Sequence, residues 1–238
     1  TVSSPSAPTP PPSASVSARA RDHLGVTLAD RYRLVRPLGF GATARVFLAV
    51  DTHLERHVAI KVLHPDLMAQ PQVRRRFRAE AQAAAKLRHP NVVTIYESGE
   101  VDELSYIAME LIEGDNLRRW LGASERPWRA ILDVFLQAGE GLAAAHRGGI
   151  LHRDFKPDNV LVDLRDRAKV VDFGLAKAAD AASILATLTT REVEADVELE
   201  GVPLSGTVLT QTGSILGTPV YMAPEQHESA KHTDERAD

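Results

Sequence analysis

Residues 149–163 read GILHRDFKPDNVLVD, and this is the stretch from which the fold can be identified. Apolar runs at 150–151 and 160–162 bracket a polar core that holds carboxylates, a lysine, an arginine and a carboxamide. Charged side chains between buried segments cost free energy unless they bind one another or a ligand. The sequence therefore predicts a rigid loop, anchored at both ends by apolar side chains, whose polar groups meet at one site.

Length and composition are those of an ordinary soluble globular protein. The chain has 238 residues, 44% hydrophobic and 25% charged, which suits one large domain or two small ones. A net charge of −4 gives no electrostatic basis for binding nucleic acid, so no such partner is expected. Cysteine is missing, which excludes disulfides, thiolate nucleophiles and cysteine zinc sites and fits a reducing compartment. No apolar run approaches the roughly 18 residues of a membrane helix.

The composition and the apolar pattern of the sequence change along the chain. Residues 1–29 are rich in Pro, Ser and Ala and predict a disordered tail. Alternating or apolar runs predict strands at 32–39, 44–50, 57–63, 92–97, 104–110, 160–162 and 168–171. Helical spacing predicts one helix between the prolines at 71 and 90, and a second from 126 to the glycines at 148–149. Residues 178–209 predict a long loop.

A glycine-rich segment, Gly39-Phe40-Gly41, lies between the first two predicted strands. In a dinucleotide-binding fold such a turn opens a helix, but here a strand follows, so the segment is the tip of a β-hairpin. Glycine backbone N–H groups at such a tip can lie over phosphates. A plain hairpin turn is the alternative.

A lysine and a glutamate form a possible pair in the same half of the chain. Strand alternation puts Lys61 on one face with Ala59, a small residue that leaves room for a flat ligand. Glu80 lies beside the apolar stripe of its helix, where a carboxylate needs a cation, and Lys61 is the obvious partner. The alternatives are an exposed edge lysine and a surface glutamate.

The polar core of residues 149–163 contains groups suited to phosphoryl transfer. Asp154 could accept a proton from an attacking hydroxyl, and Lys156 could neutralise a transferred phosphoryl group. Asn159 offers a neutral oxygen to a hard cation, and Asp172, at a strand end before Phe173-Gly174, is well placed to bind Mg²⁺. A salt-bridged turn is the alternative for either stretch alone.

Taken together, these features occur in a characteristic order: glycine hairpin, strand lysine, helix glutamate, HRDxKxxN, DFG, and then APE at 223–225. From about Tyr32 to its last residue the chain resembles the protein kinases, specifically the bacterial eukaryotic-like (Hanks-type) serine/threonine kinases. The resemblance implies an α+β bilobal fold at 30–238. A small antiparallel β-sheet lobe with one key helix (about 30–112) precedes a mainly helical large lobe (about 113–238), and the activation segment spans 172–225 with an inserted loop at about 178–209.

The resemblance also implies roles for individual residues. The catalytic residues are Asp154 as base, Lys156 as the phosphate-neutralising cation, and Asn159. Mg²⁺, or Mn²⁺ in its place, is bound by Asn159 and Asp172. Lys61 holds the α- and β-phosphates of ATP and pairs with Glu80. The implied nucleotide-binding residues are Leu38, Gly39, Phe40, Gly41, Val46, Ala59, Lys61, Glu80, Met109, Glu110, Ile112 and Leu161.

Regulation and partners follow from the same resemblance. Arg153, directly before Asp154, implies control by activation-loop phosphorylation, because a guanidinium there pairs with a phosphate. Thr210 and Thr212 match the family's autophosphorylated threonines, with an unmodified polar loop as the alternative, and Thr218 matches the threonine of the substrate loop. The expected partners are ATP, protein substrates and a transient homodimer for autophosphorylation. A cytoplasmic location is expected for this segment.

The last residues, DERAD at 234–238, resemble the entry to the central helix of the large lobe, whose aspartate braces the catalytic loop. The helices that follow it in the family are missing, so we expect an incomplete large lobe with lowered stability and poor activity. The sequence thus predicts a serine/threonine protein kinase. The alternative is a non-catalytic nucleotide-binding or scaffold fragment.

Overall fold

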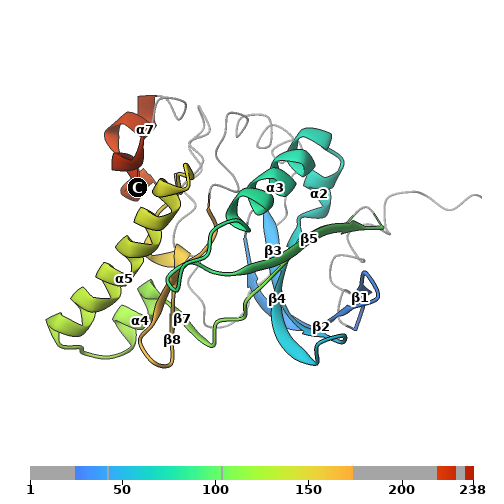
Figure 1. Cartoon of the computed structure of the whole chain (residues 1–238), viewed down its shortest axis with the longest axis horizontal. Helices are drawn as coiled ribbons and strands as arrows, with labels where there is room; N and C mark the ends of the chain where they lie inside the picture. Colours follow the sequence, from blue (N-terminus) through green and yellow to red (C-terminus); the bar gives the residue numbers. More distant parts are fainter. Residues whose placement is uncertain (1–24, 42, 103, 174–218, 229–233) are drawn as a thin grey trace, which may run out of the picture.

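The computed structural model describes residues 25–41, 43–102, 104–173, 219–228 and 234–238 (Figure 1). The predicted loop insertion and residues 1–24 of the predicted tail lie outside these ranges. The end predicted for the tail, residue 29, is wrong, because Thr27–Leu28 forms a strand and Leu28 is buried in the core. The described residues form a curled antiparallel sheet with one helix against it, and a second part built around the long helix α5 (Figure 1). Within those ranges no helix combines the length and apolarity needed to cross a membrane. The predicted α+β class is confirmed.

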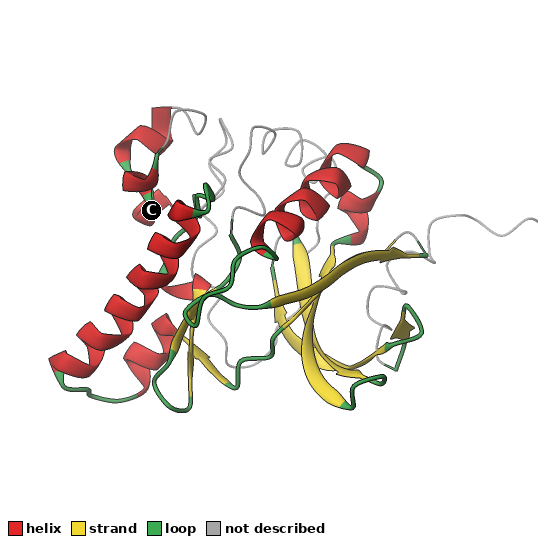
Figure 2. Ribbon diagram, viewed as in Figure 1, coloured by secondary structure: helices red, strands yellow, loops and turns green. Residues whose placement is uncertain are grey.

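The larger sheet has six strands in the order β1-β2-β3-β4-β6-β5. Figure 2 shows its strands in yellow, as a curled sheet. Its strands are β1 (Thr27–Leu28), β2 (Tyr32–Phe40), β3 (Ala44–Asp51), β4 (Arg56–Leu63), β5 (Ile95–Val101) and β6 (Leu104–Met109). Val58, Ile60 and Val62 of β4 are buried in one apolar cluster, whereas Ala59 belongs to another. The alternation predicted for β4 is therefore confirmed, and Lys61 shares the face of Ala59.

Helix α3 (Pro71–Ala84) packs against the sheet, where Phe77 is buried with Ile107 of β6. The sequence predicts that this helix continues to Pro90, and that prediction is wrong. The helix ends at Ala84 because the next segment is used elsewhere: Leu87 packs against the core of the second part.

The segment after α3 connects the two parts of the molecule. A strand is predicted at 92–97, but β5 begins only at Ile95. Val92 instead forms an isolated bridge with Val170, and the Val93 N–H donates to the Val170 carbonyl oxygen at 3.0 Å. Pairing with a strand of the second part thus replaces the first residues of the predicted strand.

The second part contains a three-stranded sheet and most of the helices. Its elements are β7 (Gly114–Asn116), α4 (Leu117–Ala123), α5 (Trp128–Arg147), β8 (Val160–Asp163), β9 (Ala168–Val170), α7 (Pro224–Glu228) and 3₁₀ turns at 157–159, 219–221 and 235–237. The short helix α2 (Pro65–Met68) belongs to the first part and lies beside α3. The sequence places Trp128, Ile131, Phe135 and Leu142 at helical spacing on α5. Leu142 is buried and Ile131 packs against the core, but Trp128 and Phe135 are 66% and 44% exposed. Val134 and Ala138 complete the packed face in their place.

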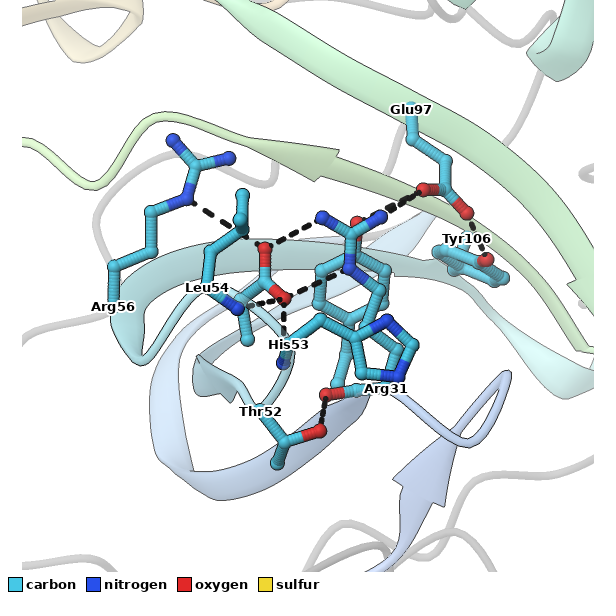
Figure 3. A network of polar contacts seen from close by, with 9 residues as sticks. Arg31, Thr52, His53, Leu54, Arg56, Glu97 and Tyr106 are labelled. Atoms are coloured by element: carbon cyan, nitrogen blue, oxygen red, sulfur yellow. Dashed lines mark hydrogen bonds and ion pairs between the residues drawn. The ribbon is translucent and has the colours of Figure 1, made fainter.

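A network of charged and phenolic groups joins β2, β3, β5 and β6 (Figure 3). Asp51 is fully buried, and both its carboxylate oxygens accept from the Arg31 guanidinium at 2.8 Å. The third nitrogen of Arg31 donates to Glu97 at 3.0 Å, and the hydroxyls of Tyr32 and Tyr106 donate to Glu97 at 2.9 and 2.7 Å. Hydrogen bonding from Arg31 lowers the pKa of Asp51 to about 2, and burial raises that of Tyr32 to about 12.

Replacing Asp51 by Asn should destabilise the chain by about 2 kcal/mol, because a neutral amide cannot accept both guanidinium bonds and leaves Arg31 with Glu97 as its remaining counter-charge. Urea denaturation of the two chains measures the difference. The matched control is Glu100→Gln, since Glu100 binds Arg74 and Arg78 at the surface and its loss should cost well under 1 kcal/mol. Equal losses for the two variants would contradict this account of the network.

Candidate active site

The polar core of residues 149–163 forms a compact loop between α5 and β8. Lys156 Nζ lies 3.0 Å from Asp154 Oδ2. Asn159 donates from Nδ2 to the Asp154 carbonyl oxygen at 2.8 Å, and its Nδ2 lies 3.4 Å from Asp154 Oδ2. Two of the residues predicted to be catalytic, Lys156 and Asn159, therefore lie beside the carboxylate of the third, Asp154.

A buried imidazole supports this loop from beneath. His152 is fully buried, its Nδ1 accepts from the Asp154 N–H at 3.2 Å, and its Nε2 lies 2.9 Å from the Val171 carbonyl oxygen. An imidazole that accepts at Nδ1 and donates at Nε2 is neutral, and burial lowers the pKa of His152 accordingly. Its ring also packs against Phe173, with centroids 5.0 Å apart.

A buried carboxylate also holds the loop. Asp238 accepts from the backbone N–H groups of His152 and Arg153 at 2.5 and 2.6 Å and lies 2.9 Å from His146 Nε2. Its side chain is 1% exposed. The bracing contact predicted for this aspartate is therefore confirmed.

Two residues of the site have backbone conformations that are rare outside glycine. Arg153 has φ +64° and Asp172 has φ +62°. Left-handed conformations cost free energy and persist where surrounding contacts enforce them, often at functional sites. Here the Asp238 bond to the Arg153 N–H and the His152 bond to Val171 supply such contacts. Sequence patterns gave no signal for this strain.

Lys61 reaches the site from β4. Its Nζ lies 2.8 Å from Asp172 Oδ1, and its side chain is only 8% exposed. The exposed edge lysine considered as the alternative is therefore excluded. Glu80 lies on α3, but its side chain is not among the described ones. The predicted pair between Lys61 and Glu80 thus stays a prediction.

Apolar side chains from both parts meet above the loop. Ala59 and Met109, which are register partners on β4 and β6, are buried together, and Val46 and Leu161 pack against them. Leu161 comes from β8 of the second part, whereas the other three come from the six-stranded sheet. These four predicted nucleotide-binding residues therefore form one apolar cluster.

The glycine segment is a hairpin tip, as predicted. The Gly41 N–H donates to the Ala44 carbonyl oxygen at 2.9 Å and closes the turn between β2 and β3. Leu38 and Phe40 are 40% and 72% exposed, so this edge of the sheet presents apolar side chains to solvent. The hairpin therefore has apolar surface with which to cover a ligand.

The connection between the two parts contains an ion pair that the sequence did not predict. Glu110 Oε2 accepts from Lys169 Nζ at 2.9 Å, and the Glu110 N–H donates to the Thr94 carbonyl oxygen at 2.9 Å. Lys169 is the register partner of Leu161, which places it on the side of β9 that faces the connection. Glu110 and Ile112 border a cavity of about 760 Å³ with Lys169, but no predicted catalytic residue lines it.

The site also offers oxygen ligands for a divalent cation. Asn159 donates from Nδ2 to Asp154, so its amide oxygen is left for a cation. Lys61 contacts Oδ1 of Asp172, so the other carboxylate oxygen, Oδ2, is left for the same cation. The Val171 N–H donates to the Asn159 carbonyl oxygen at 3.0 Å and brings the two residues together. Within the described ranges no group of three or more His, Asp or Glu side chains could hold a metal. Two protein oxygens, completed by phosphate and water, fit the preference of Mg²⁺.

The residue that directly follows the predicted activation segment contacts the loop. Gln226 of α7 donates from Nε2 to the Arg153 carbonyl oxygen at 3.0 Å. Thr210, Thr212 and Thr218 lie outside the described residues, so their predicted roles rest on the sequence alone.

Comparison with known proteins identifies relatives over most of the chain. The model of the protein kinase domain family matches residues 32–238. The serine/threonine-protein kinase PrkC of Bacillus subtilis is 39% identical over 205 residues, which cover 85% of this chain and 28% of the relative. PknA of Mycobacterium tuberculosis is 37% identical over 220 residues, which cover 89% of this chain and 45% of the relative.

A solved structure shows the same arrangement of elements. The kinase domain of Mycobacterium tuberculosis PknI matches with a TM-score of 0.57 and 34% identity, over 64% of this chain and 62% of that domain. This chain thus spans less than half the length of the two curated relatives and less than two thirds of the solved domain.

Acidification should weaken the fold through His152. Because its folded-state pKa lies below the ordinary value of about 6.5, the unfolded chain binds more protons below that pH, and the free energy of unfolding falls. The loss between pH 7 and pH 5 should reach as much as about 2 kcal/mol, measured by urea denaturation. His152→Gln should show a flatter pH dependence, and identical slopes for the two chains would contradict this assignment.

Removing the Asp238 carboxylate should loosen the loop. In Asp238→Asn one amide oxygen must replace two acceptors, so the N–H groups of His152 and Arg153 should exchange with deuterium at least about tenfold faster, as measured by NMR. Asp234→Asn is the control, because Asp234 contacts only Arg236 of the neighbouring surface turn among the described residues. Unchanged protection in Asp238→Asn would show that the loop does not depend on this contact.

Proposed function

The chain belongs to the protein kinase family, and we propose that it is the larger part of a serine/threonine kinase domain that transfers the γ-phosphoryl group of ATP to protein hydroxyls. The observation that supports this most is the loop in which Lys156 and Asn159 contact Asp154, with the Lys61–Asp172 ion pair contributed by the other part. The proposed division into a small lobe (about 30–112) and a large lobe (about 113–238) follows from the arrangement of the two parts.

Asp154 acts as the base in this proposal. The hydroxyl oxygen of a substrate serine or threonine forms a bond to the γ-phosphorus, its proton passes to the Asp154 carboxylate, and the bond from the γ-phosphorus to the bridging oxygen breaks to release ADP. Lys156, 3.0 Å from Asp154, lies close enough to neutralise the transferred group.

The small lobe supplies most of the nucleotide site. Val46, Ala59 and Met109, with Leu161 from the large lobe, form the apolar cluster that would enclose the adenine ring. Leu38, Phe40 and the glycines of the hairpin would cover the phosphates, and the backbone of Glu110 and Ile112 would contact the adenine edge. Lys61 would hold the α- and β-phosphates, and its pairing with Glu80 remains part of the proposal.

A divalent cation completes the site in this proposal. Asn159 and Asp172 would hold Mg²⁺, or Mn²⁺, through one oxygen each, because both residues retain an oxygen after their other contacts are made. The cation would supply positive charge to the phosphate oxygens. The residues' own contribution is to fix two oxygens at the end of β9 and at the end of the loop.

Regulation by phosphorylation is proposed from Arg153. Its Nε is buried and has no hydrogen-bond partner among the described residues, and a guanidinium with a buried, unused N–H is suited to binding an anion. Phosphate on Thr210 or Thr212, added by a second copy in a transient homodimer, would provide that anion, and Thr218 would contact the catalytic residues. Because the reaction consumes ATP, we propose that it occurs in the cytoplasm.

The Asp154→Asn variant tests the proposed function. With radiolabelled ATP, Mg²⁺ and a generic protein substrate, transfer should fall about 100-fold or more, because the carboxamide cannot take the proton. ATP binding, measured by calorimetry, should persist. Asp115→Asn is the matched control, since Asp115 is exposed and its nearest ion-pair partner, Arg119, is 4.0 Å away.

The outcome also decides between the proposal and its alternative. Mass spectrometry of the labelled chain should find phosphate on Thr210 or Thr212. Labelling that survives Asp154→Asn would contradict the role of Asp154. ATP binding without any transfer by the unaltered chain would favour the non-catalytic nucleotide-binding or scaffold fragment.

A further inference from the structure

An ion pair joins three elements at the edge of the candidate active site. Arg118 of α4 donates from Nε to Asp158 Oδ1 at 3.0 Å and from Nη2 to Asp158 Oδ2 at 2.8 Å. The same Nη2 lies 3.2 Å from the Tyr221 hydroxyl. Arg118 therefore connects α4, the 157–159 turn of the catalytic loop and the 219–221 turn.

This pair is attached to the loop that contains the proposed catalytic residues. Asp158 is the chain neighbour of Asn159, whose amide contacts Asp154. Lys156 is also close enough to lower the pKa of Asp158, although the hydrogen bond from Arg118 is the larger cause. An extended substrate with its hydroxyl at Asp154 advances about 3.3 Å per residue, so a side chain a few positions from the acceptor would lie beside this pair.

The pair is accessible from solvent. The side chains of Arg118 and Asp158 are 50% and 35% exposed, and the Nη1 of Arg118 has no hydrogen-bond partner among the described residues. An exposed pair of this kind contributes little to folding stability, so stability alone is a weak reason for its two-point geometry. Each charge, if left alone, would attract a substrate side chain of the opposite sign.

We propose, on the basis of the proposed kinase function, that Arg118 and Asp158 are specificity-determining residues that cancel each other's charge, so that the substrate residue bound beside them is not selected by charge. The substrates are then proteins that need neither a basic nor an acidic side chain at the position bound beside this pair. Removal of one partner would expose the other and create selection that the unaltered chain lacks. The two single substitutions would create selection of opposite sign.

Four chains test this proposal: unaltered, Arg118→Gln, Asp158→Asn and the double variant. The probes are seven-residue peptides with a central threonine and glutamine elsewhere, in which Arg or Glu replaces glutamine at one position at a time. Phosphorylation rates and peptide affinities, the latter by fluorescence anisotropy, are expressed as the ratio of the Arg peptide to the Glu peptide. Using a ratio removes changes in overall activity. Arg119→Gln, on the same helix, is the control for loss of a surface charge.

At one peptide position the unaltered chain should give a ratio near one. Arg118→Gln should favour the Arg peptide by about two- to fivefold, and Asp158→Asn should favour the Glu peptide by a similar factor, as expected for exposed ion pairs. The double variant and Arg119→Gln should return to a ratio near one. High salt should remove both preferences, because exposed charges are screened.

The proposal is overturned if both single variants shift the ratio in the same direction, if neither shifts it, or if the double variant keeps a preference. Affinity ratios separate this result from the proposed function. Expected affinity shifts without phosphorylation by any chain would contradict the kinase activity but support the subsite. Phosphorylation with unshifted ratios would contradict the subsite alone.

Discussion

The hydrogen bonds of one buried, neutral imidazole hold the two halves of the candidate active site in register. His152 accepts from the Asp154 N–H with one nitrogen and lies 2.9 Å from the Val171 carbonyl oxygen with the other, so one ring fixes the catalytic loop and the chain just before Asp172. A protonated ring would have no acceptor for the Asp154 N–H. Asp238 also holds the same loop, through two backbone N–H groups. The positions of both site carboxylates therefore depend on contacts made underneath them.

The molecule contains buried charges of two kinds. Asp51 is enclosed by two bonds from Arg31, which in turn binds Glu97, and every described partner lies in the sheet or in a turn next to it. Lys61 instead has one described partner, Asp172, whose side chain is 36% exposed. Both carboxylate oxygens of Asp51 are used within the protein, so this arrangement serves the fold. Lys61 retains N–H donors and Asp172 retains one carboxylate oxygen, and a ligand can use both. This difference separates a structural ion pair from one suited to binding.

Much of the fold follows from local patterns, because strand alternation is decided by neighbouring residues. The β-hairpin at Gly39–Gly41 and the inward face of Lys61 were predicted on this basis, and both are confirmed. The packed face of α5 was not, because Phe135 and Val134 both satisfy helical spacing and only the neighbouring elements choose between them. The end of α3 was not predicted either, because it depends on the packing of Leu87 against the second part.

The candidate site was predictable in its residue types but not in its geometry. HRDxKxxN and DFG identify which side chains matter, because phosphoryl transfer needs these groups together. The left-handed conformations of Arg153 and Asp172 arise from contacts between distant segments, which local sequence does not record. The Lys169–Glu110 and Arg118–Asp158 pairs are of the same kind, since each joins charges that are far apart in the chain.

The bonding of residues 92–94 has a mechanical consequence. Val92 and Val93 are tied to Val170 of the large lobe, so the chain crosses into the six-stranded sheet only after them. It crosses back at Glu110, whose N–H is bonded to the Thr94 carbonyl oxygen at 2.9 Å. The two crossings therefore lie side by side and are joined by a hydrogen bond. Rotation of the lobes about the line of these crossings would keep the bond between Glu110 and Thr94, whereas sliding of one lobe past the other would require that bond to break.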